Sequence, residues 1–135
     1  LTKNTYIYLF NNSLKTLITK ISDMEMIHEF PKAQKFSFAN EVAYQSGGIV
    51  SKNVLKRPTG NVSLFAFDKG ESLSTHTAPF DAMVQVLEGN ARIIIGGNPY
   101  DLVSGETIIM PANIPHSVEA TEKFKMLLTM IKEPK

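Results

Sequence analysis

The sequence predicts an all-β fold, an antiparallel sandwich or barrel, preceded by a short N-terminal helical extension. From Ile49 onward, short runs rich in β-branched and aromatic residues follow one another almost to the end of the chain. The breaks between these runs carry Gly, Pro, Asn or Asp, the residues that permit or impose the backbone angles of tight turns. No helical pattern interrupts the runs. Closely spaced strands without intervening helices are typical of all-β sandwiches and barrels.

The first part of the chain has a different pattern. Residues 11–24 predict a short amphipathic helix, with Asn12 or Ser13 as its N-cap. Its apolar residues recur at the spacing of one helix face, namely Leu14, Leu17, Ile18 and Ile21. We expect this face to pack on a second subunit, which would make the protein a homodimer. Residues 29–48 are a mixed segment, so we divide the chain into an N-terminal extension, residues 1–40, and a barrel, residues 41–135.

The strands of the predicted barrel follow from the alternating runs. They lie at residues 49–55, 61–68, 72–76, 82–88, 91–96, 99–103, 107–111, 116–120 and 124–131. Two of the connections, Glu88-Gly89 and Gly97-Asn98, favour hairpin turns. Alternation places every second residue on one face. The residues expected to face the interior are Ala82, Val84, Val86, Val118, Met126 or Leu128, and Phe65 or Phe67.

Composition excludes several classes of protein. The chain has 135 residues, which suits one barrel domain behind the extension, and a net charge of +1, with no basic stripe for nucleic acid. No apolar run approaches the roughly 18 residues of a membrane span. The absence of Cys excludes disulfides and thiolate metal sites, and it is compatible with the reducing cytoplasm, where we expect the protein to act.

Two spaced motifs carry the candidate chemistry. The first runs from Gly70 through His76 to Gly89, and the second runs from Gly105 through Pro111 to His116. This layout resembles the two motifs of the cupin family, G-x5-H-x-H-x3,4-E-x6-G and G-x5-P-x-G-x2-H-x3-N. The resemblance covers roughly residues 49–131. It implies a cupin-like antiparallel β-barrel, also called a double-stranded β-helix or jelly roll.

The chain departs from the family pattern at four positions, which are Ala78, Ala82, Asn113 and Ala120. Asn113 replaces a glycine, and Asn is the best substitute in the left-handed region, so the turn is expected to persist. The two alanines of the first motif stand where the family has a histidine and a glutamate that bind metal. The resemblance therefore implies a site that retains only two metal ligands.

The retained ligands of the implied site are His76 and His116, which the fold would bring into one cavity. Asp81 or Gln85 would join them only after a one-residue slip of the strand, because strict alternation turns Gln85 outward. A simpler role for Asp81 is a hydrogen bond to backbone in its turn. Two neutral imidazoles would hold one divalent metal ion, such as Fe, Mn, Ni or Zn, only weakly.

Three functions remain open from the sequence. The first is a small cupin that binds a metal ion, a small organic ligand in the barrel, or both. The second is a metal-dependent dioxygenase or isomerase acting on a small organic substrate. The third is a non-enzymatic ligand-binding or accessory module. No residue is assigned a catalytic role.

Overall fold

The structure, a computed structural model, describes residues 5–8 and 29–133, and almost all of its regular elements are strands. They are β1 (Thr5–Tyr8), β2 (Ile49–Arg57), β3 (Gly60–Phe67), β4 (Ser72–His76), β5 (Ala82–Ile95), β6 (Asn98–Val103), β7 (Thr107–Met110), β8 (His116–Glu119) and β9 (Phe124–Ile131). A short 3-10 helix, η2 (Phe38–Asn40), lies between β1 and β2 in the chain. In this described part, no helix is long and apolar enough to cross a membrane.

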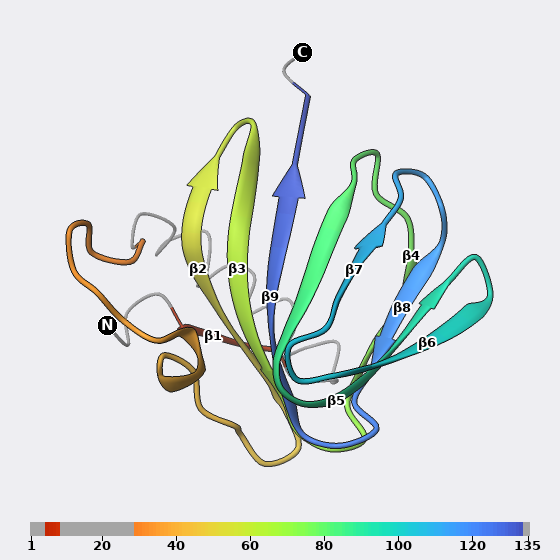
Figure 1. Ribbon diagram of the computed structural model, residues 1–135, viewed down its shortest axis with the longest axis horizontal. Coiled ribbons are helices and arrows are strands. Elements are labelled where there is room, and N and C mark those ends of the chain that lie inside the picture. Colours follow the sequence, from red (N-terminus) through yellow and green to blue (C-terminus); the bar gives the residue numbers. More distant parts are fainter. Residues whose placement is uncertain (1–4, 9–28, 134–135) are drawn as a thin grey trace.

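The strands form two facing walls, as in a jelly roll. The hydrogen-bonded order is β1-β2-β3-β9-β5-β8-β4, with β6 and β7 also paired to β5, and every pairing is antiparallel. The first half of β5 pairs with β7 and β9, and its second half pairs with β6 and β8. Figure 1 shows β5 curling from one wall into the other. The predicted antiparallel barrel is confirmed.

A bend within β5 corrects one predicted turn. Residues 82–88 and 91–96 were expected to be two strands joined by a hairpin at Glu88-Gly89, and that expectation is wrong. The chain continues through one strand of 14 residues. The register against β9 shifts between Val86 and Glu88, and Gly89 has a φ of 80°. A bulge with a left-handed glycine bends a strand without reversing it, so Glu88-Gly89 bends β5 instead of forming a hairpin turn.

The second predicted hairpin is present but lies one residue earlier. Ile95 pairs with Asn98, so the two turn residues are Gly96 and Gly97, rather than Gly97 and Asn98. Their φ values are 57° and 83°. Positive φ at both central residues is the type I′ geometry, whose twist matches that of the flanking strands.

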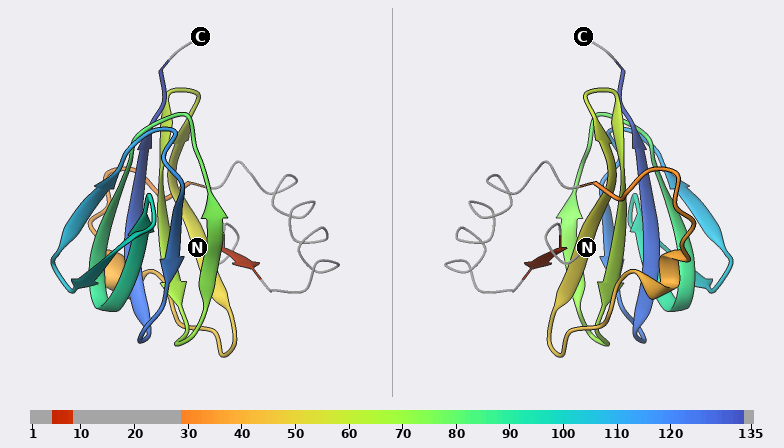
Figure 2. Two further views of the ribbon diagram at one scale, coloured as in Figure 1. Left: turned by 90° about the vertical axis from the view of Figure 1, so that its right-hand side faces the viewer. Right: turned by 90° about the vertical axis from the view of Figure 1, so that its left-hand side faces the viewer.

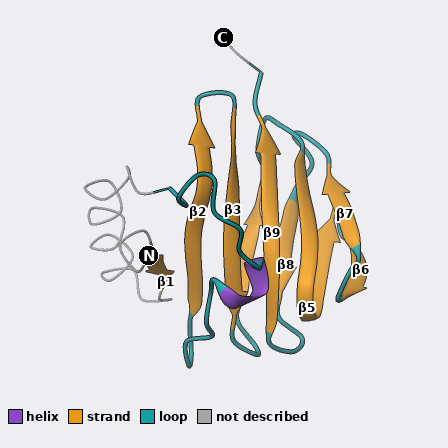
Figure 3. Ribbon diagram, turned by 60° about the vertical axis from the view of Figure 1, so that its left-hand side comes forward, coloured by secondary structure: helices purple, strands orange, loops and turns teal. Residues whose placement is uncertain are grey.

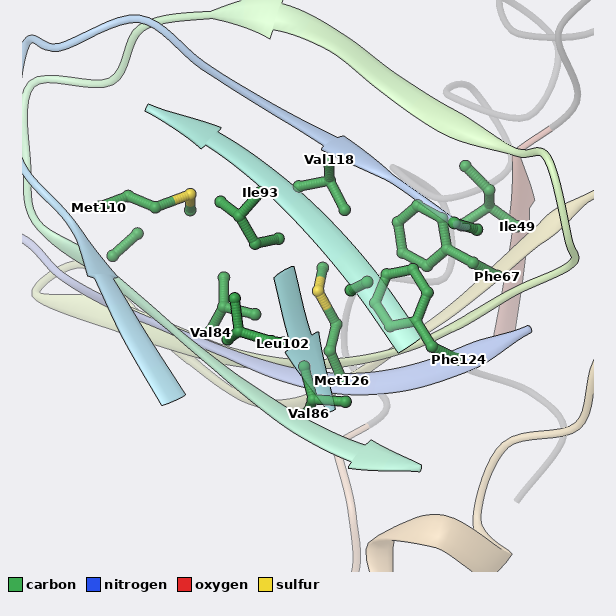
Figure 4. Packing of buried hydrophobic residues seen from close by; sticks show 13 residues of the cluster. Ile49, Phe67, Val84, Val86, Ile93, Leu102, Met110, Val118, Phe124 and Met126 are labelled. Atoms are coloured by element: carbon green, nitrogen blue, oxygen red, sulfur yellow. The ribbon is translucent and has the colours of Figure 1, made fainter. Parts of the chain in front are cut away.

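The interior between the walls is filled by apolar side chains (Figure 4). Its deepest part contains the rings of Phe67 and Phe124, which stack with centroids 4.5 Å apart beside Ile49. The predicted alternation is confirmed, because Ala82, Val84 and Val86 are buried in this cluster. The other predicted interior residues, Val118, Met126, Leu128, Phe65 and Phe67, belong to it or pack against it.

The segment of residues 29–44 crosses the outer face of β2, β3 and β9 (Figure 3), and a second apolar cluster joins the segment to these strands. The Lys125 ammonium fastens this segment by donating to the Ala39 carbonyl at 2.6 Å, and it pairs with Glu88 at 3.4 Å. The Tyr44 hydroxyl donates to the same carboxylate at 2.8 Å. Burial, together with that carboxylate, raises the pKa of Tyr44 above its usual value. The segment is therefore tied to the barrel by polar contacts as well as apolar ones.

Two expectations concern residues that lie outside the described part of the chain. The amphipathic helix at 11–24, and the homodimer that its apolar face would form, fall on those residues. The division of the chain at residue 40 also stays a prediction.

Candidate functional site

One end of the barrel, here called the upper rim, gathers the candidate residues. It is formed by the β2–β3 turn, the 77–81 loop and the 111–115 loop, which lie at the same end in Figures 1 and 2. His76 is the last residue of β4, just before the 77–81 loop, and His116 is the first residue of β8, just after the 111–115 loop. The two histidines therefore stand at strand ends on a single rim.

Hydrogen bonds tie the two loops of the rim together. The Ala112 N–H donates to Oδ1 of Asp81 at 2.8 Å, and the Asn113 N–H donates to the Ala78 carbonyl at 2.7 Å. Asn113 has a φ of 64°, which confirms the expected left-handed turn at this position. The loops thus hold the adjoining ends of β4, β5, β7 and β8 in a fixed relation.

The two histidines meet in the β4–β8 pairing. His76 and His116 are register partners, and their Nε2 atoms lie 3.1 Å apart. The rings are inclined by 69°, with centroids at 4.4 Å. His116 is only 5% exposed, whereas His76 is open to solvent. The His116 imidazole is thus enclosed by the protein, and solvent reaches the pair from the side of His76.

Backbone carbonyls determine which ring nitrogens carry protons. Nδ1 of His76 lies 2.8 Å from the Ser74 carbonyl, and Nδ1 of His116 lies 3.1 Å from the Ile114 carbonyl. A carbonyl oxygen only accepts, so each Nδ1 must donate and each neutral ring keeps its lone pair on Nε2. Two lone pairs then face each other across 3.1 Å. This contact is repulsive unless a proton or another cation lies between them.

Burial keeps the inner imidazole neutral. It lowers the pKa of His116 below the usual histidine value, the nearby His76 lowers it further, and the Ile114 carbonyl acts in the opposite direction. The Nε2 lone pair of His116 is therefore available at neutral pH.

The two Nε2 atoms are suitable ligands for a transition-metal ion, but they are only two. Two nitrogens 3.1 Å apart can both lie about 2.1 Å from one ion, the usual Zn–N distance. Carbonyl partners on Nδ1 are also the usual support for metal-binding histidines. No group of three or more His, Asp or Glu that could hold a metal ion occurs among residues 29–133. The two imidazoles would therefore leave most coordination positions open.

The alanines of the first motif bring no donor. Ala82 is buried at the start of β5, within the interior cluster. Ala78 uses its carbonyl to accept from Asn113. Neither methyl group can bind a metal.

The additional candidates, Asp81 and Gln85, are not brought to the histidine pair. Oδ1 of Asp81 accepts from the Ala112 N–H, so the expected bond to backbone is present but reaches the facing 111–115 loop instead of a residue of its own turn. The register of β5 carries no shift before Val86, so Gln85 lies on the opposite face from Val84 and Val86. Their role as metal ligands stays a prediction that this geometry does not favour.

An open groove of about 1020 Å³ lies on the rim beside these loops. It is lined by Pro58, Thr59, Pro79, Phe80, Asp81, Ala112, Ile131, Lys132 and Glu133. The Lys132 ammonium lies 5.3 Å from the centre of the Phe80 ring, and the Ile131 side chain is 72% exposed. The lining combines apolar side chains with charged groups, as small-ligand sites commonly do.

Sequence reasoning missed this groove and the two carbonyls that orient the imidazoles. Every residue has a carbonyl, so Ser74 and Ile114 carry no sequence signal for that role. The sequence also gave no indication of the position of Met110 and Met130 beside Ala82, which depends on cross-strand register. The alternation of β7 and β9 could have shown that they face inward, but not which residue they adjoin.

The comparisons with known proteins agree with this architecture. A conserved Streptococcus pyogenes protein of unknown function is 35% identical over 81% of this chain and 96% of its own, with a TM-score of 0.76. A cupin 2 conserved barrel domain protein from Leptotrichia buccalis is 49% identical, with a TM-score of 0.70. That match covers 72% of this chain but only 47% of the Leptotrichia chain. A cupin superfamily protein from Desulfitobacterium hafniense, 24% identical over 78% of this chain and 97% of its own, shares the fold with a TM-score of 0.74.

The sequences support the same assignment at the level of the family. No curated protein sequence matches the chain. The Cupin domain family matches residues 63–132, just over half of the chain, and this range contains both motifs and both rim histidines. The protein therefore belongs to the cupin family.

Proposed function

We propose that this cupin binds one transition-metal ion through Nε2 of His76 and Nε2 of His116. The observation that carries the proposal is the pair of facing lone pairs, 3.1 Å apart, with both Nδ1 atoms anchored to carbonyls. An ion between the two nitrogens turns a repulsive contact into two coordinate bonds. The rings are already oriented for this, so binding requires little rearrangement.

The role that fits this donor set is binding of a small organic ligand at the metal. Two neutral imidazoles leave the charge of the ion uncompensated, so an anionic or oxygen-donor molecule would complete its coordination. Such an ion supplies Lewis acidity to an oxygen bound to it. The protein's own residues hold the ion at the rim, with the exposed His76 on the solvent side and the apolar interior behind His116.

Removal of either imidazole should weaken this binding substantially. We expect untagged protein to bind one equivalent of Ni(II), and His76→Ala and His116→Ala each to weaken binding by at least tenfold, about 1.4 kcal/mol. Isothermal titration at neutral pH measures the affinities. His28→Ala removes the third histidine of the chain and should leave them unchanged. Equal affinity in the parent and in His76→Ala, an exposed position whose loss leaves the core intact, would contradict the proposal.

The rim groove favours a second candidate function, a metal-free module that binds a small amphipathic ligand. Phe80 and Ile131 supply apolar surface, and Lys132 supplies a positive charge beside them. An aromatic anion would satisfy both features. This role requires neither histidine.

A fluorescent aromatic sulfonate, anilinonaphthalene sulfonate, tests the groove directly. We expect the parent to enhance its fluorescence, and Ile131→Asp to remove most of the enhancement because the substitution places a negative charge on the groove wall. Val103→Asp is the matched control, since Val103 is another exposed apolar residue and lies outside the groove. Equal fluorescence from all three proteins would count against a ligand site there.

A further inference from the structure

Two methionines flank Ala82 on the inner face of the barrel. Ala82 pairs with Met110 of β7 on one side and with Met130 of β9 on the other. Directly opposed residues on one sheet face have Cβ atoms about 5 Å apart, so the two thioether side chains border the Ala82 methyl. Met110 is 4% exposed, and Met130 packs against the interior cluster. Figure 4 shows the Met110 side chain in the same interior as Val84 and Ile93.

This row of side chains lies at the same end of the barrel as the histidine pair. The 111–115 loop connects Met110 to His116, and the 77–81 loop connects His76 to Ala82. The two loops are hydrogen-bonded to each other, and the Ile131 N–H donates to the Asp81 carbonyl at 3.4 Å, which joins the end of β9 to the same rim. Two imidazoles on one wall and two thioethers on the other therefore share the upper rim.

The four donors have one chemical property in common, which is that they are neutral. Asp81, the rim carboxylate nearest in sequence to His76, is exposed and bonded to the Ala112 backbone. Among the described residues, no carboxylate joins the two histidines in a group that could hold a metal ion, so a divalent ion between them would gain no anionic ligand. Thioether ligands favour soft ions such as Cu(I), which carries a single charge and accepts mixed nitrogen and sulfur donors.

We propose that the upper rim is a Cu(I) site, in which Met110 and Met130 provide thioether ligands beside His76 and His116. The inference rests on the proposed metal binding by the histidines and specifies the metal. It makes the alanine at position 82 a functional feature, because a small residue there leaves space for the two flanking side chains.

Competition for Cu(I) tests the inference. The protein as it exists is titrated anaerobically against the chromophoric chelator bicinchoninate, and the Cu(I) affinity is compared among the parent, Met110→Leu, Met130→Leu and the double variant. Leucine preserves most of the volume of methionine, so the barrel should tolerate each change. Met83→Leu is the matched control, because Met83 adjoins Ala82 in sequence but lies on the outer face opposite Ile109.

We expect the double variant to lose at least tenfold in Cu(I) affinity, about 1.4 kcal/mol, while its Ni(II) affinity changes far less. Met83→Leu should match the parent for both ions. X-ray absorption of the copper-loaded parent should show sulfur bound to copper, a readout that does not depend on how well the variants fold.

The other outcomes separate the two proposals. Unchanged Cu(I) affinity in the methionine variants, or a copper spectrum with nitrogen and oxygen neighbours alone, would overturn the thioether site while the histidine site stands. Binding of Ni(II) without Cu(I) would do the same. If the parent protein binds neither Cu(I) nor Ni(II), both the histidine site and the thioether site are wrong.

Discussion

Replacement of Gly89 by alanine should largely prevent the barrel from folding. At a φ of 80°, an added Cβ would lie 1.8 Å from the Lys123 carbonyl oxygen and 2.8 Å from Cα of Phe124. Both obstacles are backbone, so the clash can be relieved only if β9 moves away from β5. That movement would also disrupt the stacked rings of Phe67 and Phe124. We expect a loss of more than about 4 kcal/mol, a large fraction of the stability of an ordinary domain.

Gly70→Ala is the matched control for this experiment. Gly70 has a similar φ, 86°, but nothing lies within 4 Å of the Cβ that would be added. This variant therefore bears only the cost of a left-handed alanine, about 1–2 kcal/mol. Chemical denaturation of the two variants separates the steric clash from the backbone preference. A similar loss in both would mean that the bend of β5 can open at little cost.

Introduction of both absent donors, Ala78→His with Ala82→Glu, should convert the weak site into a tight one for harder ions. Ala78 lies within the 77–81 loop and Ala82 directly follows it, and this loop is held by hydrogen bonds to the 111–115 loop. The new carboxylate would compensate the charge of a divalent ion, and the new imidazole would add a third nitrogen. We expect the affinity for Mn(II), Fe(II) or Ni(II) to rise well above tenfold, more than about 1.4 kcal/mol.

The carboxylate can be tested separately from the shape of the side chain. Ala78→His with Ala82→Gln places an uncharged amide of the same size at the buried position. Titration at about pH 7.5, where unperturbed imidazole is mostly neutral, should give a much smaller gain for this variant. A folded Ala78→His, Ala82→Glu protein with the affinity of the parent would show that these positions do not reach the histidine pair.

Much of the barrel could be predicted because its signals are local. The alternation of Ala82, Val84 and Val86 with polar or longer residues determines which face is buried, since successive side chains of a strand point to opposite faces. The tight turns require glycine or asparagine, so residues such as Asn113 indicated both the position and the conformation of a loop. For His76 and His116, the resemblance to the two cupin motifs, rather than a local pattern, implied that the fold brings them into one cavity.

Other features depended on contacts between segments far apart in the chain. Whether Glu88-Gly89 reverses the chain or bends it depends on the β9 backbone, which lies against Gly89. The tautomers of the histidines depend on the carbonyls of Ser74 and Ile114, whose directions follow from the paths of β4 and the rim loop.

By itself, the sequence determined an antiparallel all-β fold, the positions of most strands along the chain and the buried faces, because period-two alternation and turn residues act over a few positions. Only the tertiary structure decided how the ends of the strands meet. The pairing of Ala82 with both Met110 and Met130 is a matter of register among three strands. Register depends on the packing of the whole barrel, and no local pattern within any one of the strands specifies it.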